Sequence, residues 1–149
     1  MFEKDLERED REKAVRLQHR TANLNGLYES LDEFVQSCKF ARQSPSSGRV
    51  ADQMIEALHT LLMTLADAAE TDDPAEREMT LTLLTHRDEL MERIRQRVLR
   101  EDPDMPARAQ EALFTTTMLF ERVIWLARRS ALLFSSDNGA GHRSPAGAS

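Results

Sequence analysis

The chain has 149 residues, and 40% of them are hydrophobic, which is enough apolar material for one domain with a single core. Its five glycines and five prolines are too few for a collagen-like or a turn-rich all-β protein. The net charge of −6 argues against non-specific binding of nucleic acid, because neutralising phosphates requires a basic surface.

The first predicted element is one long helix over residues 2–42. Two interleaved series of residues at heptad spacing predict its packing face, namely Leu17, Leu24, Leu31 and Cys38 together with Thr21, Tyr28 and Val35. The first thirteen residues lack this pattern and mix both signs of charge, so the start of the chain, taken as a charged extension over residues 1–16, is predicted to be a solvated helical extension or a frayed helix end. They also lack the apolar stretch of a secretion signal.

Proline-containing breaks divide the rest of the chain into three further predicted helices. Residues 44–48 combine turn-forming residues with a proline and predict a linker. Asp73 can cap the helix that follows it, and Pro74 suits the first helical position. The three predicted helices span residues 49–70, 74–100 and 106–134.

Four amphipathic helices with short connections predict an all-α fold, an antiparallel bundle of about four helices. The bundle domain is predicted over residues 17–134, after the charged extension over residues 1–16. Residues 135–149 are rich in glycine, alanine and serine and carry no apolar stripe, so they predict a disordered tail.

The most apolar run of the chain, residues 112–134, is interrupted by four charged residues near its middle. Charges at such positions are costly inside a bilayer, so direct membrane insertion is not expected. The single cysteine, Cys38, cannot form an intrachain disulfide, and this favours a reducing, cytoplasmic location. At a position on the apolar stripe, Cys38 is predicted to be a buried structural thiol.

One catalytic alternative is a metal-dependent enzyme. Glu56 and His59 form a Glu-x-x-His step on one helix face, and His86 and Glu89 would complete the ligand set. Carboxylate-bridged di-metal bundles need two such steps and two further glutamates, whereas this chain has one step. Phosphate-binding glycine-rich loops and the Gly-x-Ser-x-Gly turn of hydrolases are both missing from the sequence. We therefore predict a protein that is not an enzyme and has no cofactor.

A second alternative is a histidine phosphotransfer bundle that uses His19. Residues 19–23, His-Arg-Thr-Ala-Asn, are similar to the His-Arg-x-x-Asn stretch around the phosphorylated histidine of one group of sensor kinases. Such a protein needs an exposed histidine on a long helix, which the predicted first helix supplies.

The fourth predicted helix carries the candidate interaction residues. A lone tryptophan in a helix, here Trp125, is typical of core or interface packing. Apolar residues outside the main stripe, such as Phe114 and Met118, make this helix apolar nearly all round, which indicates a central helix or an interface. The residues predicted to contact a partner are Glu121, Arg122, Trp125, Arg128 and Arg129.

Three stretches carry a resemblance to a known family. An aspartate pair, Asp72 and Asp73, follows a long helix, and residues 87–94 read Arg-Asp-Glu-Leu-Met-Glu-Arg-Ile. Residues 119–125, Leu-Phe-Glu-Arg-Val-Ile-Trp, are similar to a Leu-Glu-Arg-Ile-x-Asp helix. Through these stretches, residues 54–134 resemble the three-helix unit of the PhoU family, which also forms the cytoplasmic C-terminal part of bacterial sodium/phosphate cotransporters.

The resemblance implies a PhoU-like bundle that acts as a non-enzymatic regulatory or interaction domain associated with phosphate transport. Glu121 and Arg122 match the family's Glu-Arg pair, whereas Trp125 stands where the family has a metal-holding aspartate, so no metal is expected. The implied partner is a protein, either a phosphate transporter at the membrane or a second copy in a homodimer. The implied location is cytoplasmic, peripheral to the inner membrane. A generic helical scaffold or adaptor is the remaining alternative.

Overall fold

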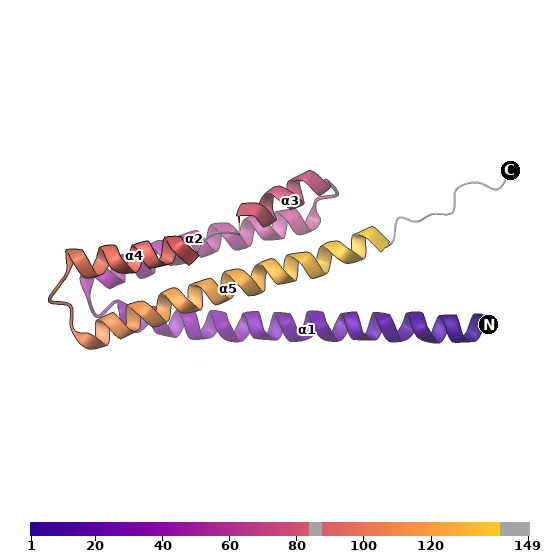
Figure 1. Ribbon diagram of the computed structural model, residues 1–149, viewed down its shortest axis with the longest axis horizontal. Coiled ribbons are helices and arrows are strands. Elements are labelled where there is room, and N and C mark those ends of the chain that lie inside the picture. The colour runs from indigo at the N-terminus through magenta and orange to yellow at the C-terminus, as the bar shows by residue number, and fades with distance from the viewer. Residues whose placement is uncertain (84–87, 141–149) are drawn as a thin grey trace.

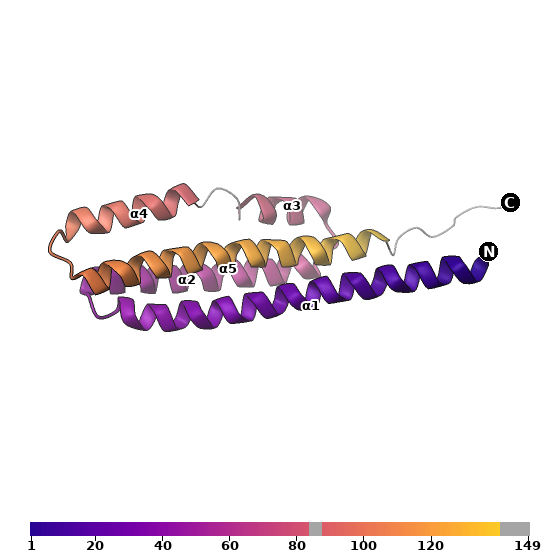
Figure 2. The same ribbon diagram turned by 60° about the horizontal axis from the view of Figure 1, so that its bottom comes forward.

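The computed structural model describes residues 1–83 and 88–140, and the regular structure in these residues is entirely helical. Figures 1 and 2 show an elongated bundle in which successive helices reverse direction, except that α4 continues in the direction of α3. The all-α prediction is therefore confirmed. The helices in this part of the chain are α1 (Phe2–Ala41), α2 (Pro45–Glu70), α3 (Pro74–Leu83), α4 (Asp88–Glu101) and α5 (Ala107–Ala140).

The range 74–100, predicted to be one helix, carries both α3 and α4, so the count of about four helices becomes five in the described residues. Residues 84–87 lie outside the described part of the chain. Within α3, the hydroxyls of Thr80 and Thr82 donate to main-chain carbonyls one turn earlier. Such back-bonding lowers the stability of a helix interior.

The predicted linker over residues 44–48 is mostly helical, because α2 begins at Pro45 instead of residue 49. Ser44 is extended and Pro45 takes the first helical position, which suits its fixed φ. The Ser47 hydroxyl donates to the Ala41 carbonyl at 2.7 Å and ties the new helix to the end of α1. A Cβ on Gly48 would lie 3.2 Å from the Cα of Arg42, so glycine permits this tight turn.

The predicted start of the helix at Pro74 is confirmed. The Asp73 carboxylate accepts a hydrogen bond from the Ala75 amide at 2.9 Å, as a helix N-cap does. Thr71 adds a second local contact, because its hydroxyl donates to the Glu76 carboxylate at 2.8 Å. The sequence signal at this break was therefore correct in both position and mechanism.

The helix α5 lies at the centre of the bundle and contacts α1, α2 and α4. Its buried side includes Leu113, Phe120 and Val123, and the Phe120 ring lies 6.0 Å from that of Phe34 on α1. The helix continues past Phe134, where we expected it to end, to Ala140. No proline interrupts it there, and a long helix extends at little cost through residues of modest propensity. The rest of the predicted tail lies outside the described residues.

The packing face of α1 differs from the predicted one. Leu17, Leu24, Tyr28 and Val35 are exposed, whereas α1 buries a series offset by one residue, including Asn23, Ser30, Phe34 and Ser37. Small side chains in this series let α5 approach closely, and Phe34 fills the remaining space against Phe120. Cys38, at the end of the predicted stripe, is buried as expected.

The described helices include none with an apolar stretch long enough to cross a membrane. The charged residues that interrupt the apolar run over residues 112–134 lie along α5. This helix packs against α1, α2 and α4.

Candidate protein-interaction surface

The outward side of α5 carries four large apolar side chains in one line. We call them the α5 stripe: Phe114, Met118, Trp125 and Leu132, of which between 44% and 55% is exposed. Their spacings of four and seven residues place them on one helix face. The opposite side of α5 is buried in the core, so the helix is apolar on both sides. A helix of this kind is typical of a surface that is covered in an assembly.

Trp125 is the most exposed member of the α5 stripe, at 55%. The Arg129 guanidinium lies 5.4 Å from the centre of its indole ring, which is the geometry of a cation–π contact. Arg122 is exposed one turn earlier on the same face. The indole is thus flanked by positive charge and still open to solvent. The structure brings together three of the five predicted interaction residues at this point.

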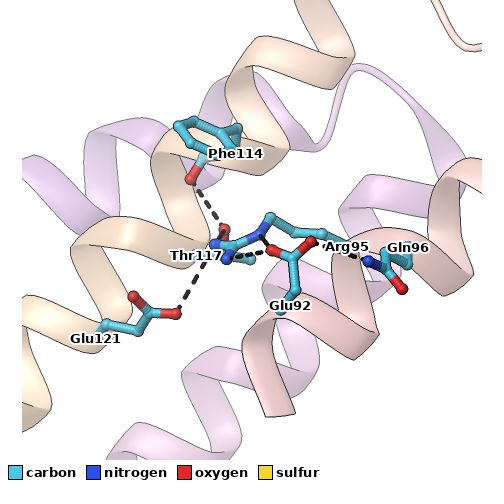
Figure 3. Close-up of polar contacts among 6 residues, drawn as sticks. All are labelled: Glu92, Arg95, Gln96, Phe114, Thr117 and Glu121. Atoms are coloured by element: carbon cyan, nitrogen blue, oxygen red, sulfur yellow. Dashed lines mark hydrogen bonds and ion pairs between the residues drawn. The ribbon is translucent and has the colours of Figure 1, made fainter. Parts of the chain in front are cut away.

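The end of the α5 stripe at Phe114 is held by Arg95 from α4 (Figure 3). The Arg95 side chain is only 14% exposed, and its guanidinium lies 5.2 Å from the centre of the Phe114 ring. It donates to the Thr117 hydroxyl at 2.8 Å and through two nitrogens to the Glu92 carboxylate at 3.1 and 2.8 Å. These contacts join α4 to α5 and fix the orientation of Phe114.

Glu121 and Arg128 complete the set of predicted interaction residues, and both turn away from solvent. Glu121 is 26% exposed and lies 3.8 Å from Arg95, so it belongs to the contact between α5 and α4 shown in Figure 3. Arg128 is half-buried. Their position indicates that they support the bundle beneath the α5 stripe, while Arg122, Trp125 and Arg129 face outward.

A separate groove of about 590 Å³ lies between α1 and α5. Carboxylates from Asp32, Glu33 and Glu111 line it beside the apolar side chains of Phe40 and Leu119. Its lining includes no histidine or cysteine and no member of the α5 stripe. The groove therefore presents three carboxylates and the Arg108 guanidinium next to apolar surface.

The described residues of the two catalytic alternatives lie on different helices. His19 is exposed on α1, and Glu56 and His59 are exposed on α2. The side chains of His86 and Glu89 lie outside the described residues. Within the described residues, no group of three or more histidine, cysteine, aspartate or glutamate side chains could hold a metal ion.

The Cys38 thiol is enclosed between helices and is 2% exposed. Burial raises its pKa to about 11, while the neighbouring Arg42 partly opposes this shift and Asp52 adds to it. The thiol is thus protonated at neutral pH and behaves as a small apolar side chain.

Sequence reasoning missed two structural features of this surface. Arg95 was one of several arginines near the end of a predicted helix, and no local pattern distinguishes it from Arg93, Arg97 and Arg100, which stay exposed. The buried polar residues of α1 did leave a signal, because Asn23, Ser30 and Ser37 are spaced by seven residues. A heptad of small polar residues beside an apolar heptad indicates a second possible packing face.

Comparison with family models, curated proteins and solved structures finds no match to this chain. The resemblance to the PhoU family thus gains no support from them and stays a prediction from the sequence.

Proposed function

We propose that this chain is a non-enzymatic interaction module that binds a protein partner through the α5 stripe. The observation that carries the proposal is the exposure of Trp125 beside Arg129, in line with the apolar side chains of Phe114 and Met118. Tryptophan, aromatic, methionine and arginine side chains are the types enriched where protein interfaces bury most of their binding energy. A preformed helix that displays them has little backbone entropy to lose on binding.

The charge around the α5 stripe specifies the chemistry of the partner. Arg122 and Arg129 flank Trp125, so the complementary surface is an apolar groove with carboxylates at its rim. The family resemblance implies that this surface belongs to a phosphate transporter, on its cytoplasmic side. The assignment to a phosphate transporter rests on the sequence alone, and the transporter is the first partner to test for binding.

The indole of Trp125 provides a direct assay, because it is the single tryptophan of the chain. Adding the cytoplasmic segments of a phosphate transporter is expected to shift its fluorescence to the blue and to protect it from acrylamide quenching. Trp125→Ala removes this reporter, so its binding is measured by isothermal titration calorimetry beside the wild type; it is expected to weaken binding by about thirtyfold, the loss for a hot-spot residue worth about 2 kcal/mol. Tyr28→Ala removes an exposed ring from α1 and is the matched control.

Two outcomes would contradict the proposal. If Trp125→Ala and Tyr28→Ala bound a partner equally well, the α5 stripe would not be the binding face. If no transporter segment changed the fluorescence, the phosphate-transport assignment would fail, while a different protein that bound through Trp125 would still support the module itself.

Histidine phosphotransfer is the second candidate, because His19 is exposed on a long helix and Arg16 lies one turn before it. A cationic neighbour favours a phosphorylated imidazole. Incubation with a labelled phosphoryl donor is expected to label the wild type and not His19→Gln. Equal labelling of the two proteins, or no labelling of either, would dispose of this candidate.

A further inference from the structure

The N-terminal part of α1 stands apart from the rest of the bundle. Figures 1 and 2 show α1 reaching beyond the end of α5, and the side chains of residues 1–19 are all exposed. Leu6 and Leu17 are 56% and 59% exposed. A helical segment of this length is marginal in water without a packing partner. Its exposed leucines indicate that another surface covers it.

Four residues form one line on this segment, which we call the arm stripe: Leu6, Asp10, Lys13 and Leu17. Their spacings of four, three and four residues are those of a coiled-coil seam. A leucine lies at each end, and two opposite charges lie in the middle. A second copy of this helix that runs in the opposite direction therefore places leucine against leucine and each charge against its opposite.

The segment's own ion pairs leave the arm stripe open. Arg8 contacts Glu12 at 3.2 Å, and Arg11 contacts Glu7 at 3.8 Å, each one turn apart. These pairs lie on other faces of the helix, since none of the four residues belongs to the heptad positions of the arm stripe. They support the exposed helix without occupying the surface that faces a partner.

We propose that the arm stripe pairs with the arm stripe of a second copy of this chain, in antiparallel orientation. The two-fold axis crosses the paired helices at the height between Arg11 and Glu12. Leu6 then contacts Leu17 of the second copy, and Asp10 contacts its Lys13. Each contact occurs twice, as an isologous interface requires. The two bundles then lie at opposite ends of the paired arms, and the association closes at the dimer.

The charges decide between the possible orientations. A parallel pair would place Asp10 against Asp10 and Lys13 against Lys13, and like charges in facing positions are destabilising. The antiparallel pair converts both clashes into ion pairs and keeps leucine against leucine. The same self-complementarity favours a second copy over an unrelated helix. The proposal concerns α1 and is independent of the α5 stripe.

Sedimentation equilibrium of the full chain tests the dimer. The wild type is expected to show twice the mass of the 17.0-kDa chain. Lys13→Asp places two carboxylates opposite each other and is expected to raise the dissociation constant by at least about tenfold. Combining it with Asp10→Lys exchanges the charges and is expected to restore the dimer. Lys4→Asp changes the net charge equally at an exposed position off the arm stripe and is expected to leave the dimer intact.

Three results would overturn the proposal. These are a monomeric wild type, a Lys13→Asp protein that dimerises as well as Lys4→Asp, and a charge exchange that fails to restore dimerisation. Because all these positions are exposed, circular dichroism is expected to show a folded bundle in every variant, with helical content falling only where the dimer is lost.

Cysteine cross-linking tests the orientation separately. A mixture of Leu6→Cys and Leu17→Cys proteins is expected to form the disulfide-linked pair, while each variant alone forms little. Cys38 is buried and does not compete for the reaction. Efficient cross-linking of each variant with itself would show a parallel pair and would overturn the antiparallel arrangement.

Discussion

The Asn23 side-chain amide donates to the Ser130 hydroxyl and, at 3.0 Å, to the Leu126 carbonyl, so one buried polar group on α1 recognises two positions of α5. Farther along the same face, the hydroxyls of Ser37 and Thr116 lie 2.6 Å apart. These contacts occur at fixed heights along the two helices. They therefore set the register of α1 against α5, as isolated polar groups do in coiled coils.

Replacing Asn23 by alanine is expected to lower the free energy of unfolding by about 1–3 kcal/mol, because the buried Ser130 hydroxyl loses its partner. Urea denaturation followed by circular dichroism measures the change. Asn25→Ala removes the same group from an exposed position on α1 and is expected to change stability by less than about 0.5 kcal/mol. Equal effects of the two substitutions would show that the contact between α1 and α5 does not depend on Asn23.

The contact between α4 and α5 is expected to depend on Arg95. Arg95→Ala removes the hydrogen bonds to Thr117 and Glu92 and is expected to cost about 1–3 kcal/mol of stability. It also frees the Phe114 ring, so the α5 stripe should bind its partner less tightly. Arg97→Ala, at an exposed position of the same helix, is the matched control in thermal denaturation. A melting temperature that falls equally for both variants would show that the contact between α4 and α5 does not depend on Arg95, since alanine is itself a strong helix former.

The fold class, the break at Asp73 and Pro74, and the burial of Cys38 could be predicted because each depends on residues close together in the sequence. The packing face of α1 could not, because two heptad series lie one residue apart and the difference between them is decided by α5. The series with Ser30 and Ser37 is less apolar, but it allows the closer approach. The exposure of Trp125 likewise depends on how α5 packs against the neighbouring helices, and residues close to it in the sequence do not determine that packing.

Thiol chemistry provides a test of the core around Cys38. At pH 8, a disulfide reagent is expected to react much more slowly with the folded protein than with the protein in concentrated urea, since the thiol is buried and protonated. Because the pKa of Cys38 is about 11 in the folded state, above the usual 9.0, stability should fall as the pH rises through this interval. Cys38→Ala is expected to remove that alkaline decline. Fast labelling of the folded protein would contradict the enclosed position of the thiol.

The carboxylate that holds Arg95 gives an acid-side prediction. Hydrogen bonds from Arg95, and then from Gln96, hold the pKa of Glu92 below its usual 4.5. A lowered pKa means that the folded state binds the proton less readily than the unfolded state. The stability contributed by Glu92 is therefore fully present above pH 4.5 and is lost as the pH falls through the lowered pKa.

Wild type is accordingly expected to lose more stability than Glu92→Gln between pH 5 and pH 3 in urea denaturation. Carboxyl chemical shifts in an NMR titration should place the midpoint of Glu92 below that of an unfolded reference peptide. Glu101→Gln, at an exposed position of the same helix, controls for the loss of one negative charge. Stability curves of wild type and Glu92→Gln that stay parallel through this interval would show that the hydrogen bonds to Arg95 are not maintained in solution.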